Sequence, residues 1–155
     1  MKGSAMFRPI AIATLISGSL DILFAMILTV TRGGEIGNML RSVASGPFPS
    51  ATEMGTGGAV LGLAVHFALM AIMAAVFMLI VRNRRPLLDT PYRTGIAFGV
   101  VTYFIMNWIV VPLRFDAPLP LKPMQLATQL FAHIVLVGIP FALIATRFIK
   151  RRAFS

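Results

Sequence analysis

The sequence predicts an all-α protein, an integral membrane bundle of four transmembrane helices with a short amphipathic helix in the first outer loop. Four apolar runs are each long enough to cross a bilayer, which takes about 20 residues. Only 12% of the 155 residues are charged, against about 25% in a soluble domain, and the charges gather between the runs. We therefore expect residues 1–155 to form a single transmembrane domain. The expected spans are residues 8–30, 57–81, 92–113 and 123–148.

The first span is expected to be retained in the protein rather than cleaved as a signal peptide. The apolar stretch from Ile10 to Val30 is too long for the hydrophobic region of a signal peptide. It also contains Asp21 and lacks a small-residue cleavage signal before Arg32. We therefore expect this run to be a membrane helix.

The loop between the first two spans, from Thr31 to Thr56, is expected to hold the amphipathic helix. Its apolar residues recur at helical spacing with polar residues between them, which is typical of a helix lying on a membrane surface. The apolar positions are Ile36, Met39, Leu40 and Val43. Glycine and proline residues from Gly46 to Pro49 end this helix. It is either a surface connector or a lid over an opening in the bundle.

The distribution of basic residues predicts the orientation in the membrane, because loops rich in lysine and arginine stay in the cytoplasm. The termini and the second loop carry Lys2, Arg8, Arg82, Arg84, Arg85, Arg93, Arg147, Lys150, Arg151 and Arg152, whereas the first and third loops carry Arg32, Arg41, Arg114 and Lys122. Both termini are therefore expected in the cytoplasm. The third loop contains Pro118, Pro120 and Pro123 and is expected to be stiff and non-helical.

Composition argues against two classes of binding site. The net charge of +9 does not indicate nucleic-acid binding, because the basic residues flank the spans and are not interleaved with exposed aromatic residues. The absence of cysteine excludes disulfides and thiolate metal sites. The expected partner is the lipid bilayer, and a homo-oligomer or a larger membrane complex is left open.

Each span carries one strongly polar residue, and these four residues are expected at similar depth. They are Asp21, His66, Asn107 and His133. With a rise of 1.5 Å per residue, they lie about 9 to 14 Å below the outer ends of their spans. A carboxylate at mid-helix depth costs about 2.5–3.5 kcal/mol, so it rarely lies there without a partner. We therefore expect a polar layer in the outer half of the membrane.

Small and polar residues spaced by three or four lead along each helix to the polar layer. These stripes are Thr14, Ser17, Gly18 and Ala25 around Asp21; Gly58 and Gly62 before His66; Gly95, Gly99 and Tyr103 before Asn107; and Gln125 and Gln129 before His133. Residues at i and i+4 share a helix face, and small residues let membrane helices approach closely. The stripes are therefore expected to face the bundle, with Gln125, Gln129 and Tyr103 lining a path to the layer. Pro112 and Pro140 are expected to bend their helices.

Several functions fit this layer. Asp21, His66 and His133, with Asn107, could bind or relay a proton or cation, because histidine titrates near neutral pH and a neighbouring carboxylate would hold the proton. Alternatively, His66 and His133 could ligate a haem iron from both faces, or join Asp21 around a divalent metal. A third alternative is a structural or accessory subunit. An enzyme is least expected, since no serine or cysteine lies in a recognisable nucleophile motif.

Four stretches together resemble a group of small four-span bacterial inner-membrane proteins that carry no assigned activity. They are SVASGPF from Ser42 to Phe48, GTGGAVLGLAVHFALM from Gly55 to Met70, NWIVVPLR from Asn107 to Arg114 and HIVLVGIPFAL from His133 to Leu143. The resemblance covers most of the chain and rests on these short motifs. It implies a four-helix fold and a bacterial inner membrane, and it implies no mechanism.

Overall fold

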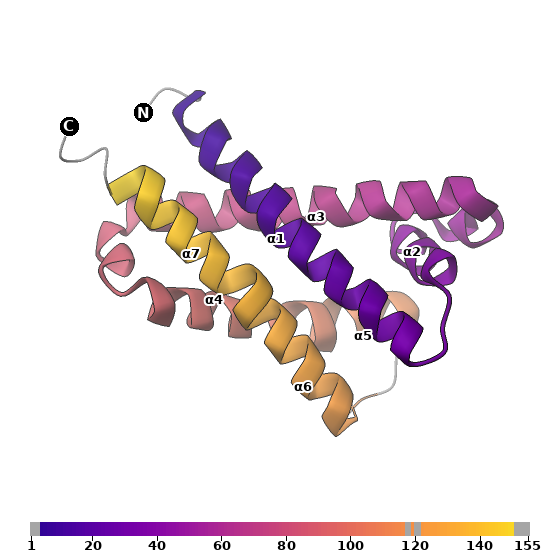
Figure 1. Cartoon of the computed structure of the whole chain (residues 1–155). Coiled ribbons are helices and arrows are strands. Elements are labelled where there is room, and N and C mark those ends of the chain that lie inside the picture. Colours follow the sequence, from indigo (N-terminus) through magenta and orange to yellow (C-terminus); the bar gives the residue numbers. More distant parts are fainter. Residues whose placement is uncertain (1–3, 117–118, 120–121, 151–155) are drawn as a thin grey trace.

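The computed structural model describes residues 4–116, 119 and 122–150, and within these ranges it contains helices and no strand (Figure 1). Some positions used above therefore lie outside the described residues, namely Lys2, Pro118, Pro120, Arg151 and Arg152. Two of the three prolines of the third loop, Pro118 and Pro120, are among these positions, so the expected stiffness of this loop stays a prediction. The all-α class predicted from the sequence is confirmed.

Four helical segments are long and apolar enough to cross a membrane: Met6–Thr31, Gly55–Asn83, Pro91–Phe115 and Pro123–Ile149. The first two are the continuous helices α1 (Ser4–Thr31) and α3 (Gly55–Asn83). The third is built of α4 (Pro91–Phe104), η3 (Ile105–Val110) and α5 (Val111–Phe115). The fourth is built of α6 (Pro123–Phe131), η4 (Ala132–Gly138), α7 (Ile139–Ala145) and η5 (Thr146–Lys150). Each segment lies within a few residues of the predicted span.

The amphipathic helix predicted in the first loop is confirmed as α2 (Ile36–Ser45), which is followed by the short helix η1 (Pro49–Glu53). Both pack against the beginning of α3. A side chain on Gly62 would overlap the carbonyl oxygen of Leu40, and one on Gly58 would overlap that of Ala51. These two glycines therefore bring α2 and η1 directly onto the first turns of α3.

Helix α1 crosses α3 and runs beside the fourth span, where it contacts η4 and α7 (Figure 1). Helix α4 packs on η4 and α7, because Gly95, Gly99 and Gly138 lie where the two backbones meet. By contrast, α3 and α4 make few direct backbone contacts along their described length. They are joined at one end by the short helix η2 (Arg85–Asp89).

The two prolines expected to bend their helices are each preceded by a π-helical turn. Pro112 follows η3, and Pro140 follows η4. A proline ring clashes with the carbonyl four residues earlier and donates no hydrogen bond, so the preceding turn must widen or bend. Asn107 and His133 lie within these two turns. Turns of this kind are frequent at functional sites.

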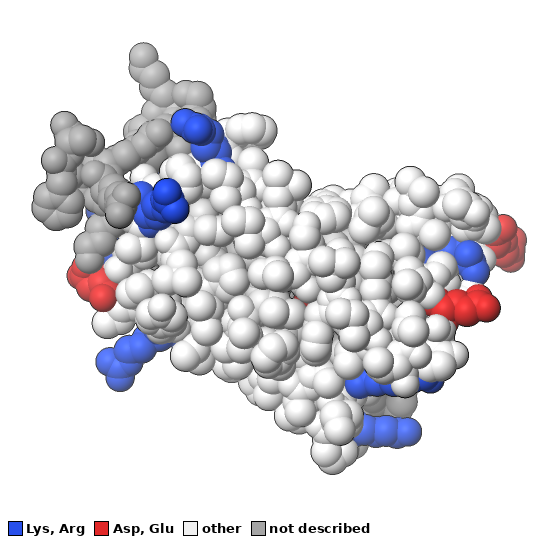
Figure 2. All heavy atoms as spheres, viewed as in Figure 1, with Lys and Arg blue, Asp and Glu red and all other residues white. Residues whose placement is uncertain are grey.

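The surface agrees with a membrane location. On the face shown in Figure 2, Lys, Arg, Asp and Glu gather at two ends and leave a broad uncharged band between them. Large apolar side chains in the spans face outward, such as Leu15 at 61%, Ile72 at 61% and Val101 at 55% exposed. Burying these side chains in lipid is favourable, whereas leaving them in water is not. The chain is therefore a multi-pass membrane protein.

Candidate functional site

The polar layer brings Asp21 of α1 and His66 of α3 together. Atom Nδ1 of His66 lies 3.9 Å from Oδ2 of Asp21. Their side chains are 10% and 22% exposed, respectively. This distance is longer than a direct hydrogen bond, which has about 2.9 Å between the heavy atoms, but it is short enough for a strong electrostatic attraction when His66 carries a proton on Nδ1. A protonated His66 would therefore be the intramembrane partner that a buried carboxylate requires.

The hydrogen bond of Nε2 of His66 determines whether Nδ1, the nitrogen nearest Asp21, carries a hydrogen in the neutral ring. Atom Nε2 lies 2.9 Å from the backbone carbonyl oxygen of Gly18, one turn before Asp21 on α1. A carbonyl oxygen only accepts hydrogen bonds, so Nε2 must carry the hydrogen. Neutral His66 would then present the lone pair of Nδ1 to a carboxylate oxygen, which is also an acceptor. A proton on either group removes this conflict between two acceptors.

His133 lies on the fourth span, in the helical turn η4, which packs on α1. Its Nδ1 lies 2.9 Å from the backbone carbonyl oxygen of Gln129 and donates to it for the reason given for His66. The ring of Tyr103 packs edge-on against the imidazole, with 6.0 Å between ring centroids. Asp21 is therefore paired directly with His66, whereas His133 lies on a helix that packs beside α1.

Asn107 is buried at the layer but is occupied within its own helix. Its amide donates to the carbonyl oxygen of Tyr103 at 3.3 Å. The hydroxyl of Tyr103 in turn accepts a hydrogen bond of 3.2 Å from the indole of Trp108. Among the described residues, no hydrogen bond joins this group to Asp21 or to His66. Asn107 and Tyr103 therefore support the wall beside His133 rather than the carboxylate.

The two glutamines on the fourth span differ in exposure. Gln125, in the first turn of α6, is exposed, whereas Gln129 and His133, one and two turns further along the span, are partly buried. The path to the layer along these residues stays a prediction. Tyr103, predicted to line the same path, is only 1% exposed, so it contacts the histidine from inside the bundle.

A closed apolar core lies directly beneath the layer, on the side of the chain termini. On the second span this core begins at Met70, one turn after His66. On the fourth span it begins at Val137, one turn after His133. The core continues through Phe77 and Phe141, which are almost fully buried. Water and ions have no polar partners in such a core. The core therefore offers no polar route from the layer to the side of the termini in this conformation.

The polar stripe of α1 reaches slightly into this core. The hydroxyls of Thr14 and Ser17 are buried, and within the described residues they have no hydrogen-bond partner. A buried hydroxyl without a partner costs about 1–3 kcal/mol, so such groups are rare unless they have a role. They extend the polar surface by two turns from Asp21 toward the termini.

The geometry does not fit a haem held by both histidines. Atom Nε2 of His66 is engaged with the Gly18 carbonyl, and Nδ1 points to Asp21, so neither nitrogen is free to bind an iron. Helix α1 also packs between α3 and η4, where a haem ring would have to lie. In the described part of the chain, no group of three His, Cys, Asp or Glu side chains converges as a metal site would require.

Sequence patterns located the residues of the layer but missed the backbone groups that fix them. Residue spacing predicts neither the role of the Gly18 carbonyl nor the two π-helical turns. The prolines that follow the two turns indicate only that the helix is distorted there. Comparison with known proteins adds no family: no family model, curated protein or solved structure matches the chain.

Proposed function

We propose that this membrane protein binds and releases one proton at the pair formed by Asp21 and His66, with His133 as the neighbouring titratable group. One observation carries this proposal. Because Nε2 of His66 donates to the Gly18 carbonyl at 2.9 Å, Nδ1 faces the Asp21 carboxylate at 3.9 Å. Without a bound proton, two acceptors would oppose each other in a buried setting, which is unfavourable.

The pair can hold its proton in two ways. The proton lies either on Nδ1, giving an imidazolium beside a carboxylate, or on the carboxyl group, which then donates toward Nδ1. Since 3.9 Å exceeds a direct hydrogen bond, a small side-chain rotation or one bridging water completes the contact. A small cation between the same two acceptors would satisfy them as well and is the second candidate ligand.

Access to the pair supports a response to conditions on one side of the membrane. The apolar core closes the side of the termini, whereas Gln125 and Gln129 lead inward from the other end. We place the termini in the cytoplasm because the basic residues gather at that end. We place the protein in a bacterial inner membrane, which the resemblance of its four motifs to small inner-membrane proteins supports. On this assignment the pair senses the outside.

The proposal is tested by thermal unfolding of the detergent-purified chain across about pH 5 to 8, the range in which histidine titrates. The test variant is Asp21→Asn, which keeps the size and hydrogen bonding of the side chain and removes its charge. A proton linked to folding changes the free energy of unfolding by up to about 1.4 kcal/mol per pH unit. We expect the pH dependence of the wild type to differ clearly from that of Asp21→Asn.

The control variant is Asp116→Asn. Asp116 lies outside the layer, at the end of α5, with a φ of 50° that asparagine also tolerates. It should follow the wild type at every pH. Identical pH profiles for the wild type and Asp21→Asn would refute the proton site and leave the structural or accessory subunit. A wild-type profile that moves with Na⁺ at constant ionic strength would instead identify a cation as the ligand.

A further inference from the structure

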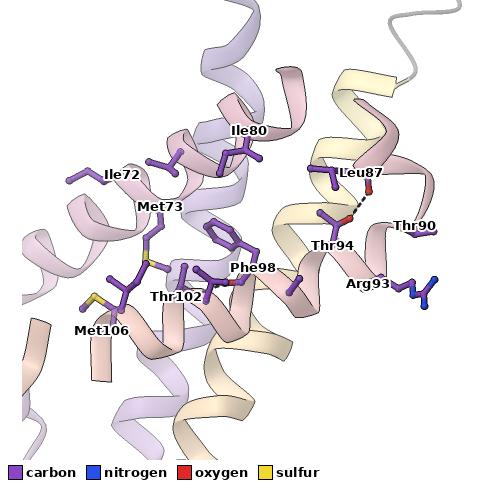
Figure 3. Close-up of a pocket in the computed structure, with 14 residues that line it drawn as sticks. Ile72, Met73, Ile80, Leu87, Thr90, Arg93, Thr94, Phe98, Thr102 and Met106 are labelled. Atoms are coloured by element: carbon purple, nitrogen blue, oxygen red, sulfur yellow. Dashed lines mark hydrogen bonds between the residues drawn. The ribbon is translucent and has the colours of Figure 1, made fainter. Parts of the chain in front are cut away.

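A long apolar groove lies between α3 and α4, away from the polar layer. Its volume is about 750 Å³. Side chains of both helices line it, including Ile72 and Ile80 of α3 and Thr102 of α4, with Met106 toward one end and Arg93 toward the other (Figure 3). The groove thus combines an apolar length with one basic end.

The groove exists because other side chains hold the two helices apart. Phe98 of α4 lies on its floor and packs on Phe77 of α3, with 4.8 Å between ring centroids. Phe141 of α7 lies behind both rings, 6.1 Å from Phe98 and 5.9 Å from Phe77. Three aromatic rings on three helices form a rigid support. The groove is therefore preformed and is not a gap that the helices could simply close.

The basic end is also held in place. The hydroxyl of Thr94 donates to the carbonyl oxygen of Leu87 at 2.6 Å, which ties η2 to the first turn of α4. Arg93 is exposed beside this contact. Arg84 and Arg85 lie at the same end of the molecule, in the connection between α3 and α4. The groove thus opens toward an end of the molecule where three arginines outnumber one acidic residue, Asp89.

The length of the groove matches one leaflet of a bilayer. From Thr94 to Met106 the helix rises about 18 Å, at 1.5 Å per residue. Half of a hydrocarbon core of about 30 Å is about 15 Å. A lipid whose headgroup lies at the level of Arg93 would therefore extend its chain along the whole groove.

We propose that this groove binds an anionic phospholipid, with one acyl chain between α3 and α4 and the phosphate at Arg93. The apolar lining suits the acyl chain, and the planar guanidinium suits a phosphate, which it can bind through two parallel hydrogen bonds. Basic residues next to a membrane span also attract anionic lipids. This lipid site is independent of the proton site, because none of its lining residues belongs to the polar layer.

The test is native mass spectrometry of the full chain in detergent, titrated with phosphatidylglycerol or phosphatidylcholine. We expect one phosphatidylglycerol to bind more tightly than any further lipid and more tightly than phosphatidylcholine. Arg93→Gln should weaken this first binding about fivefold, which corresponds to about 1 kcal/mol for one basic residue near the surface. Arg147→Gln is the matched control, since Arg147 is exposed on η5 at the same end and does not line the groove.

A second pair of variants tests the acyl-chain part of the site. Ala97→Trp places a large ring in the groove, and the exposed position allows it without disturbing the core. It should abolish the first lipid binding. Ala68→Trp, on an exposed part of α3 outside the groove, should leave it unchanged.

Three results would overturn the lipid site. The first is equal binding of phosphatidylglycerol by Ala97→Trp and the wild type. The second is equal affinity for the anionic and the zwitterionic lipid. The third is a lipid-free dimer that Ala97→Trp converts to a monomer, because a second copy of the chain would then occupy the groove. Thermal unfolding of each variant at one pH confirms that all four are folded.

Discussion

Replacing Gly99 by alanine should destabilise the bundle strongly, although it adds only one methyl group. The methyl carbon would lie 2.5 Å from the carbonyl oxygen of His133 and 2.6 Å from the α-carbon of Ile134. Both are backbone atoms, so no side-chain rotation can relieve the overlap. Helices α4 and η4 would have to separate, and the contacts on both sides of Gly99 would weaken together.

The expected cost follows from the rigidity of the contact. Overpacking a well-packed site costs about 1–3 kcal/mol, and here the obstacle is backbone, so we expect about 3 kcal/mol. For a chain of this size, a loss of 1 kcal/mol lowers the unfolding temperature by about 2–4 °C, so the expected decrease is about 6–12 °C. The assay is thermal unfolding in detergent, followed by circular dichroism.

Gly57→Ala is the matched control. Gly57 also lies in a helix, at the beginning of α3, but a methyl group there would meet no atom within 4 Å. Alanine is the better helix former by up to about 1 kcal/mol, so this variant should be as stable as the wild type or slightly more stable. An unchanged unfolding temperature for Gly99→Ala, or equal losses in both variants, would refute the close packing of α4 on η4.

Two further predictions concern the two ends of the molecule. Reporter domains fused after Ser155 and inserted at Leu119 should report opposite sides of the membrane, with Ser155 in the cytoplasm, because positive loops stay there; reporters on one side would require the spans to be redrawn. Arg114→Gln should lower the free energy of unfolding by about 1 kcal/mol. Hydrogen bonds to a charged group usually contribute more than this, but Arg114 is exposed and solvent weakens its bonds. The change removes two hydrogen bonds that Arg114 of α5 donates at the end of α2, to the carbonyl oxygens of Gly46 at 2.6 Å and Ser45 at 2.8 Å. The control Arg32→Gln, in the same outer region, should leave the free energy of unfolding unchanged.

The four spans could be predicted from the sequence because a membrane helix is specified locally. About 20 apolar residues suffice to cross the hydrocarbon core, whatever the rest of the chain does. The helix α2 was predictable for the same reason, since its apolar period and its terminating glycine and proline lie within one short segment. Its position could not be predicted, because the overlap of Gly62 with Leu40 depends on the tertiary packing of two helices.

The polar layer was predictable in part. Depth along a helix follows from residue counting, and the small-residue stripes indicate the inward face, so Asp21 and His66 could be expected to approach. Asn107 has the same depth, yet its amide bonds to the Tyr103 carbonyl. Side chains that donate to a backbone carbonyl four residues earlier compete with contacts between helices, and residue spacing does not reveal which contact forms. The separation of α3 from α4 likewise depends on how three phenylalanines pack.

The position of the apolar core decides between a binding role and a conducting role for the polar layer. A transported proton would have to pass the residues between the layer and the termini, and these include Met70, Phe77 and Phe141, with no more than 6% exposure. The unpaired hydroxyls of Thr14 and Ser17 reach into this core only part of the way. Opening a continuous path would require these helices to separate and to lose their packing. If the pair binds a proton as proposed, this arrangement favours a proton that enters and leaves on one side, and whose binding changes the stability of the bundle, over a proton that crosses it.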